Sequence, residues 1–205
     1  MLIVKTLNTI KDWFEENVCS KVMLKLPPDN FADNLADCED YDYKLGHPAC
    51  FTNSIPSADE LPAGKYNTPC ALIEFVSGSD DISEKLGTMD IQIFFSVWNT
   101  GTHPFDFFGK LREEKKGTFQ KDETGWIDVL NFVDLARLEL KKATVFKTEK
   151  TEEAFIYMDK GTPITFGYYT DGNSPLPHPY WGAWIKFRIN YKITGDTGGG
   201  DYLYG

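Results

Sequence analysis

The sequence predicts an α+β fold in which a mostly antiparallel β-sheet packs against an N-terminal helix and one long central helix. Residues 181–193 place apolar side chains at every odd position, which is the period of a strand with one buried face. Residues 3–18 and 126–142 repeat apolar side chains every three or four positions, as amphipathic helices do. With 205 residues, 41% of them apolar, the chain can bury one sizeable core. We therefore expect one domain over residues 1–194 and a flexible Gly-rich tail over residues 195–205.

The N-terminal helix, residues 3–18, is expected from a single apolar stripe. The residues of this stripe are Ile3, Leu7, Ile10 and Phe14. Residues 22–26 alternate as a short strand does, and the following Pro27 and Pro28 end it because proline cannot donate to a strand ladder.

Residues 27–69 form the first of two long loops that we expect, since apolar residues are few and prolines recur. Loops of this length are usually functional or mobile. An acidic cluster in this segment is the first set of candidate interaction residues, and it does not have the spacing of a calcium-binding loop. Its members are Asp37, Glu39, Asp40 and Asp42. Residues 49–52 are a candidate short strand within the loop.

Residues 70–76 are mostly apolar and end near Gly78, which indicates a buried strand. Residues 89–98 alternate apolar and polar side chains and predict a long strand with one face in the core. Between them, residues 77–88 are polar and are interpreted as a turn region. The two strands are expected to pair as a hairpin-like unit.

The second long loop is expected over residues 99–124, where aromatic side chains and mixed charges are not arranged to form a core. It is either a mobile surface loop or an arm that contacts a partner. Its candidate interaction residues are Arg112, Lys115 and Lys116.

The second helix, residues 126–142, has an apolar face that includes Trp126, Val129 and Leu140, with Thr124 as a candidate N-cap. Residues 144–147 and 154–158 are expected to form a short hairpin. An edge strand is expected over 162–169 because of Pro163. The final strand, 181–193, should have one core face and one basic face. Three tryptophans are assigned to core packing, namely Trp126, Trp181 and Trp184.

The net charge of −10 disfavours a sequence-general nucleic-acid binder, because a phosphate backbone would repel the molecule. The charge is unevenly distributed: residues 1–100 carry 7 basic and 16 acidic side chains, a net of −9, and residues 101–205 carry 14 and 15, a net of −1. One face or end should therefore be negative. It is either a solvated loop that favours solubility or a surface that repels nucleic acid or meets a basic partner.

Motifs that carry catalytic or cofactor chemistry are not found in the sequence. No Gly-x-Ser-x-Gly, phosphate-binding loop or dinucleotide fingerprint occurs. The four cysteines contain no Cys-x-x-Cys pair and are expected to be free thiols in a reducing compartment. No secretory leader and no continuous apolar stretch of about 18 residues is present, so we expect no membrane association. We expect no enzyme activity, cofactor or metal.

The order of elements, together with four short stretches, resembles the tail terminator type of structural protein from long-tailed bacteriophages and prophages. The resemblance covers about residues 1–25 and 69–193. The stretches that carry it are Pro69-Cys70-Ala71-Leu72-Ile73-Glu74-Phe75, Ser96-Val97-Trp98-Asn99, Gly125-Trp126 with Asp128 to Leu140, and Pro179-Tyr180-Trp181-Gly182-Ala183-Trp184-Ile185-Lys186-Phe187.

The resemblance implies a ring, commonly a homohexamer, that caps the tail tube, stops its polymerisation and provides the surface for head joining. The implied partners are further copies of the chain, the tail tube protein, a neck or connector protein and a sheath protein. DNA would pass through without specific binding, and the protein would be a virion component of the tail or neck, assembled in the host cytoplasm. The Gly-rich tail, with Tyr202 and Tyr204, is either frayed or a peptide that docks on a neighbour.

Two other functions stay open. One is another phage neck or head-completion protein, and the other, from a different class, is a small-ligand or carbohydrate-binding domain that uses exposed aromatic side chains.

Overall fold

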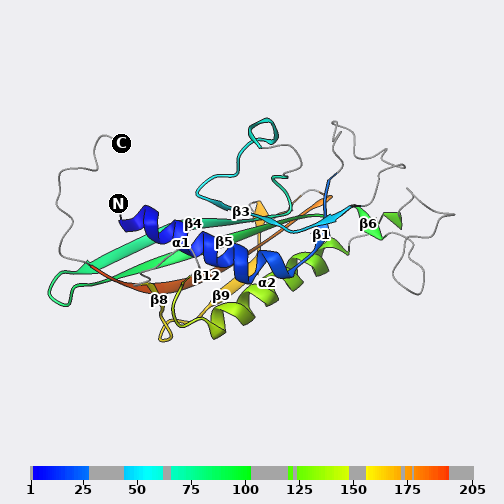
Figure 1. The fold of residues 1–205 in the computed structure, drawn as a ribbon. Coiled ribbons are helices and arrows are strands. Elements are labelled where there is room, and N and C mark those ends of the chain that lie inside the picture. Colours follow the sequence, from blue (N-terminus) through cyan, green and yellow to red (C-terminus); the bar gives the residue numbers. More distant parts are fainter. Residues whose placement is uncertain are drawn as a thin grey trace.

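The structure, a computed structural model, describes residues 2–27, 44–61, 66–102, 120–121, 124–147, 156–171, 174–176 and 178–193. It is a mixed α+β fold with one large curled sheet and two helices that lie on the same face of it (Figure 1). The predicted fold class is confirmed at this level. None of the described helices is both long enough and apolar enough to cross a lipid bilayer.

Six of the described strands form the main sheet, in the order β3-β4-β5-β12-β8, and β9 also pairs with β12. All neighbours are antiparallel except β3 and β4, which run parallel. The bounds are β3 Ala49–Thr52, β4 Cys70–Asp81, β5 Leu86–Trp98, β8 Ile156–Met158, β9 Thr165–Tyr168 and β12 Tyr180–Lys192. The whole of β12 pairs with the whole of β5, from Tyr180 opposite Trp98 to Lys192 opposite Leu86.

The predicted period of two in the last strand is confirmed by burial. Ala183, Ile185, Phe187 and Ile189 are each at most 1% exposed, and they point to the face that the helices cover. The side chains between them lie on the opposite, partly exposed face. The strand therefore contributes one of its two faces to the core.

The two helices divide the inner face of the sheet between them. Helix α1 (Leu2–Asn17) packs mainly over β3 and β4, and α2 (Gly125–Lys142) packs over β12 and β5. Both predicted helices are present, but neither is central by itself, so the expectation of one long central helix holds only in part. The reason is that a sheet this wide exposes more apolar surface than one helix stripe can cover.

Phe95 of β5 joins the two helices to the sheet. Its ring is fully buried and lies 4.7 Å from the Phe132 ring of α2 in an edge-to-face arrangement and 6.0 Å from the Phe14 ring of α1. Such aromatic pairs contribute roughly 0.5–1.5 kcal/mol each beyond the burial of their area. Both helices therefore pack against the same side chain, Phe95.

The interpretation of residues 77–88 as a turn region is wrong. β4 continues to Asp81 and β5 begins at Leu86, so that the turn takes only residues 82–85. The residues are polar because both faces of this part of the hairpin meet solvent, and not because the strands have ended. The Asp81 carboxylate accepts hydrogen bonds from the backbone N–H groups of Ser83 (2.9 Å) and Glu84 (3.1 Å), which fixes the turn.

The apolar face predicted for α2 needs one correction. Trp126 is 45% exposed, whereas Phe132 is fully buried. The helix starts so close to the sheet that a Cβ at Gly125 would lie 2.1 Å from Trp181 Nε1. Trp181 therefore occupies the space at this end of the helix. Thr124 is the N-cap residue of α2, as predicted, but its side chain makes no capping hydrogen bond.

The structure describes regular elements within both predicted long loops. In the first, β2 (Leu45–Gly46) pairs with β1 (Leu24–Lys25), β3 confirms the candidate strand over 49–52, and a 3₁₀ helix, η3 (Ala58–Glu60), follows. In the second, β6 (Gly101–Thr102) pairs with β7 (Gln120–Lys121). The strand predicted over 22–26 is thus limited to two residues.

The remaining elements are short, and some of them were not predicted from the sequence. Val145 forms an antiparallel bridge to Tyr157, flanked by backbone hydrogen bonds from the Phe146 N–H to the Ile156 carbonyl (2.9 Å) and from the Met158 N–H to the Thr144 carbonyl (3.1 Å). The described residues of the predicted short hairpin therefore pair as expected, and residues 148–155 lie outside the described residues. β9 confirms the strand expected within 162–169. A further short pair joins β10 (Thr170–Asp171) and β11 (Ser174–Pro175), and a 3₁₀ helix, η1, spans Cys19–Lys21.

We expect Phe95→Ala to lower the free energy of unfolding by about 3–5 kcal/mol, because it removes a buried ring that two helices share. Urea unfolding followed by circular dichroism measures this change. Leu138→Ala on α2, where the side chain is 54% exposed, is the matched control and should stay within about 0.5 kcal/mol of the wild type. Equal effects of the two substitutions would contradict the shared-contact description.

Candidate functional site

All of the candidate interaction residues from the sequence lie outside the described residues, so the structure does not bring them together or separate them. They are Asp37, Glu39, Asp40, Asp42, Arg112, Lys115, Lys116, Tyr202 and Tyr204.

The hairpin end, which we define as residues 75–86, holds the exposed large apolar side chains of β4, β5 and the turn between them. It extends away from the helices at one end of the molecule (Figure 1). Its exposed large apolar side chains are Phe75 (38%), Val76 (43%), Ile82 (85%) and Leu86 (45%). Exposed apolar groups that gather in one region mark interaction surfaces.

The outer edge of β4 has a strand partner over only part of its length. β3 pairs with Cys70 to Ile73, and beyond this point no described strand pairs with β4 on that side. Such an edge presents unpaired N–H and C=O groups that another chain can use. Two features reduce non-specific pairing here: a register shift between Phe75 and Ser77 that leaves Val76 as the extra residue, and the charges of Asp80 and Asp81.

A tyrosine fixes the hairpin end to the body of the sheet. The Tyr191 side chain of β12 lies across Gly87, where a Cβ would come within 2.2 Å of its ring, and its hydroxyl donates to the Asp80 carboxylate. Burial, aided by this hydrogen bond, raises the pKa of Tyr191 to about 12. The phenol is therefore a neutral donor at any physiological pH, and the hairpin end is held in one orientation.

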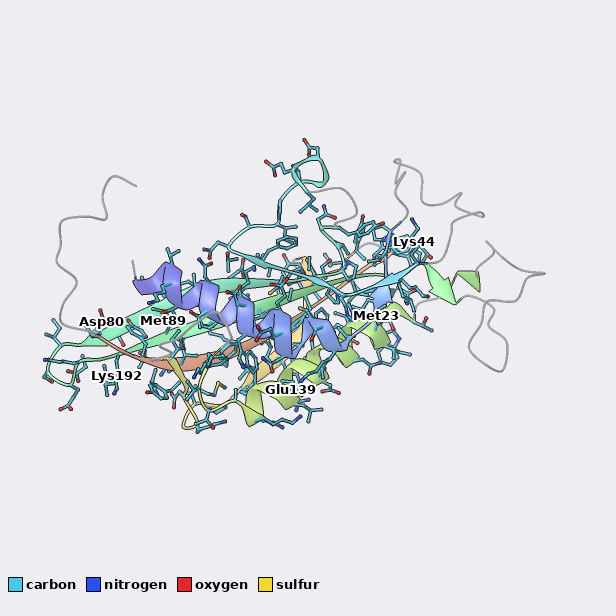
Figure 2. All side chains as sticks on the ribbon, in the orientation of Figure 1. Met23, Lys44, Asp80, Met89, Glu139 and Lys192 are labelled. Atoms are coloured by element: carbon cyan, nitrogen blue, oxygen red, sulfur yellow. The ribbon has the colours of Figure 1, made fainter. Side chains whose placement is uncertain are left out.

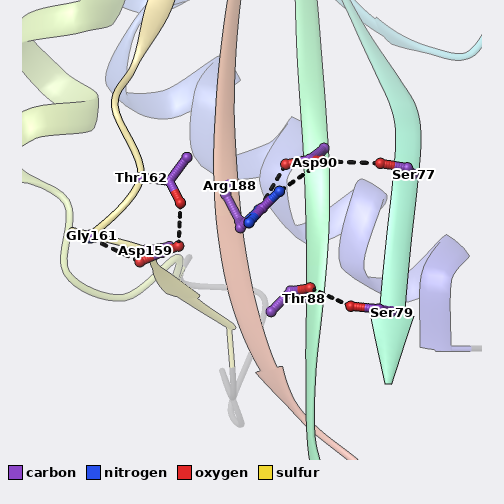
Figure 3. Close-up of polar contacts among 8 residues, drawn as sticks. All are labelled: Ser77, Ser79, Thr88, Asp90, Asp159, Gly161, Thr162 and Arg188. Carbon is purple, nitrogen blue, oxygen red and sulfur yellow. Dashed lines mark hydrogen bonds and ion pairs between the residues drawn. The ribbon is translucent and has the colours of Figure 1, made fainter. Parts of the chain in front are cut away.

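The outer face of the sheet carries a row of polar contacts across three strands, and Figure 3 views it with the helices behind the strands. Arg188 of β12 binds Asp90 of β5 through two hydrogen bonds, Nε–Oδ1 at 2.9 Å and Nη2–Oδ2 at 3.1 Å. Ser77 of β4 donates to the same carboxylate at 2.9 Å, and Ser79 shares a hydrogen bond of 2.9 Å with Thr88. These contacts explain why polar residues pair in register here.

The described carboxylates whose pKa values are shifted all have lowered values. The Arg188 guanidinium lowers the pKa of Asp90, and the Thr162 hydroxyl, which donates to Asp159 at 2.7 Å, lowers the pKa of Asp159. The pKa values of four further carboxyl groups are also lowered, those of Asp59, Glu60, Asp81 and Glu139. At neutral pH these groups are ionised and act as hydrogen-bond acceptors. Among the described residues, no group of three or more His, Cys, Asp or Glu side chains is arranged to hold a metal ion.

A buried polar network lies at the other end of β5, where the chain leaves toward residues 103–119. The Lys25 ammonium, on a residue 9% exposed, donates to Asn99 Oδ1 at 2.8 Å and to the Gly101 carbonyl. The Asn99 amide donates to Asp128 Oδ2 at 2.6 Å, and its oxygen also accepts from the Gly101 N–H at 2.9 Å. Trp181 Nε1 donates to the Asn99 carbonyl at 3.2 Å. Asn99 thus joins β1, α2 and β12 at the base of the second long loop.

A cavity of about 540 Å³ lies between η1, β2 and β3. Cys19 and Cys50 are part of its lining, and both are buried. Hydrogen bonding to Cys19, together with burial, raises the pKa of the Cys50 thiol, and burial raises that of Cys70 to about 12. All three described cysteines are free, as expected, and the raised pKa values leave the thiols of Cys50 and Cys70 neutral and poorly nucleophilic at neutral pH. The fourth, Cys38, lies outside the described residues.

Comparison with protein-family models gives no match for this chain. Comparison with curated proteins likewise gives no match.

Sequence reasoning missed both the hairpin end and the Asn99 network. For the hairpin, a signal was present: Ser77 and Ser79 in β4, and Thr88 and Asp90 in β5, alternate with period two. For the network, one buried lysine and one asparagine 74 positions apart give no local pattern.

We expect Asn99→Ala to destabilise the fold by about 1–3 kcal/mol, because it leaves the buried groups of Lys25 and Asp128 without this partner. Chemical denaturation measures the change. Ser20→Ala, which removes one exposed side-chain hydrogen bond to a helix carbonyl, is the control and should stay within about 0.5 kcal/mol. An Asn99→Ala variant as stable as the control would contradict a structural role for the network.

The Asp90–Arg188 pair predicts a pH dependence of stability. Because the folded pKa of Asp90 is lowered, its contribution is complete above the ordinary value of about 3.9 and is lost as pH falls through the folded value. The stability difference between wild type and Asp90→Asn should therefore shrink as the pH is lowered from 5 to 2. The effect at neutral pH should be small, since the Arg188 side chain is 41% exposed to screening solvent. A difference that grows on acidification would contradict the assignment.

Proposed function

We propose that this protein is a structural subunit of the tail terminator type, which assembles into a ring on the phage tail tube. In this role the ring stops polymerisation of the tube and offers the surface for head and neck joining. The observation that carries the proposal is the hairpin end: four exposed large apolar side chains on a hairpin whose outer edge lacks a described strand partner. Surfaces of this kind become buried when copies of a chain assemble.

The geometry supports a binding function in a second way. The groups that project from the described sheet are held by neighbours: Tyr191 fixes the hairpin end, and Asn99 fixes the base of the second long loop. Fixed, exposed surfaces lose little conformational entropy when they bind, which favours stable assembly.

The charge distribution suits a ring that DNA traverses. The net charge of −10 per copy would repel the phosphate backbone and keep the passage free of specific binding. The proposed partners are therefore further copies of the chain, the tail tube protein and a neck or connector protein, with the virion tail as the location. The copy number expected from the resemblance is six.

Two alternatives have support of their own. Another neck or head-completion protein would use the same exposed hairpin and differ only in its partner. A small-ligand-binding domain is favoured by the cavity of about 540 Å³, whose lining includes the apolar side chains of Leu26, Phe51 and Leu61.

We expect the purified full chain to form closed rings, alone or after addition of tail tube protein, and to shorten the tubes that this protein forms. Light scattering gives the mass, and negative-stain electron microscopy gives the shape and tube lengths. Val76→Lys on the exposed β4 edge should reduce assembly, whereas Val4→Lys on the exposed side of α1 is a matched control that should leave it unchanged. A chain that stays monomeric at all concentrations, with and without tube protein, and leaves tube length unchanged would contradict the proposal.

A further inference from the structure

We propose that the tip of the hairpin end of one copy inserts into a basic, apolar-lined cavity beside α2 of a second copy. This inference rests on the proposed function, because it names the contact through which the ring would close. We call residues 80–86 the hairpin tip and the cavity between α2 and β9 the α2 cavity.

The hairpin tip combines one exposed apolar side chain with negative charge. Ile82 is 85% exposed, which is the highest fraction among the large apolar side chains that the structure describes. The tip contains three acidic residues, Asp80, Asp81 and Glu84, and one basic residue, Lys85, so that its net charge is −2. Covering a solvent-exposed isoleucine at the end of a hairpin with a partner lowers the free energy, because apolar surface is removed from water.

The tip is preorganised for binding. The Asp81 carboxylate accepts from the N–H groups of Ser83 and Glu84 and from the Ser83 hydroxyl at 2.6 Å, and Lys85 adopts a positive φ of 54°. Behind the turn, Tyr191 is packed across Gly87. Ile82 is thus presented on a turn whose backbone is already fixed, and little ordering is needed on binding.

The α2 cavity has the complementary chemistry. Its volume is about 310 Å³, and its apolar lining comes from Leu140, Met158, Ile164 and Phe166. Among the described residues that line it, three are cations, Arg137, Lys141 and Lys160, and one is a carboxylate, Asp159, for a net charge of +2. Arg137 also pairs with Asp134, outside the lining, at 2.5 Å. An aliphatic side chain with flanking carboxylates matches this combination of apolar lining and basic rim.

The cations of the α2 cavity are held in position. The Lys160 ammonium donates to the carbonyl of Lys141 at 2.9 Å and to that of Ala143, at the C-terminal end of α2. The Arg137 guanidinium lies 3.8 Å from the centre of the Phe166 ring. Within the part of the chain that the structure describes, no carboxylate lies within ion-pair distance of Lys141. Lys141 is therefore available to a carboxylate of another chain.

The hairpin tip and the α2 cavity are different surfaces of one copy, so their contact is head-to-tail. The tip joins β4 and β5, whereas the cavity lies beside β8 and β9, which pair with the other edge of β12. In Figure 2, Asp80 marks the hairpin tip and Glu139 marks α2, and the two labels lie apart on the molecule. A head-to-tail contact produces a ring when the rotation closes, which is the assembly that a terminator requires.

A charge-reversal experiment on the full chain tests the contact. Glu84→Lys and Lys141→Glu should each raise the concentration needed for assembly at least tenfold, and the double variant should recover it. Ile82→Ser should give a similar loss without recovery. All three positions are exposed, so the variants should fold, and thermal unfolding checks this. Glu16→Lys, an equal charge change at an exposed position of α1, is the matched control and should assemble as the wild type does.

A mixing experiment tests the head-to-tail geometry. A copy with Ile82→Ser keeps an intact cavity, and a copy with Lys141→Glu keeps an intact tip. Each alone should stay monomeric, and an equimolar mixture should stop at dimers, because only one productive contact can form. Sedimentation velocity measures both states. Mixtures that stay monomeric, or that form rings, would overturn the proposed geometry.

The outcomes separate this inference from the proposed function. Wild-type rings that no tip or cavity variant affects would overturn the inference and leave the proposed function in place. If Lys141→Glu leaves ring formation unchanged and abolishes binding of the tail tube protein, the occupant of the cavity is the tube protein and the inference is wrong. A wild-type chain that never assembles, with or without tube protein, contradicts both.

Discussion

The burial of Phe95 between Phe14 and Phe132 is the contact on which the rest of the arrangement depends. A fully buried ring between two helices requires that both helices lie on one face of the sheet, side by side. The opposite face then carries polar side chains together with an aromatic group of Phe94, Tyr169 and Trp184, and the ends of the long strands project beyond the helices. The exposed hairpin end is thus a consequence of where the core can form.

The projecting part of the sheet is stable because its contacts run across strands. β12 pairs with β5 along its full length, and Tyr191, Arg188 and the serine–threonine pair connect three strands in addition to the buried layer that includes Met89 and Ile189. Such a region tolerates exposed apolar side chains because it does not depend on them for its own folding. This is the physical basis for assigning Ile82 and its neighbours to a contact with another molecule.

The sequence allowed the elements to be predicted where one face of an element is buried. The last strand and both helices have a clear period, and burial of Ile185 and Phe132 agrees with it. Residues 77–88 were misjudged because a strand that is exposed on both faces has no apolar alternation to detect. Trp126 was misjudged because hydrophobicity alone does not reveal that the start of α2 is blocked by Trp181. Networks such as that of Lys25 and Asn99 join segments that are distant in the sequence, so no local sequence pattern predicts them.

The extra residue at Val76 determines which side chains of β4 face each side of the sheet from that point to the turn. Ser77 and Ser79 reach the polar face, and Asp80 reaches Tyr191, only because one position is skipped there. An insertion or deletion of a single residue between Val76 and the turn would exchange the two faces and place serines against the helix side. Insertions or deletions in the hairpin of sequence variants should accordingly be tolerated in steps of two residues.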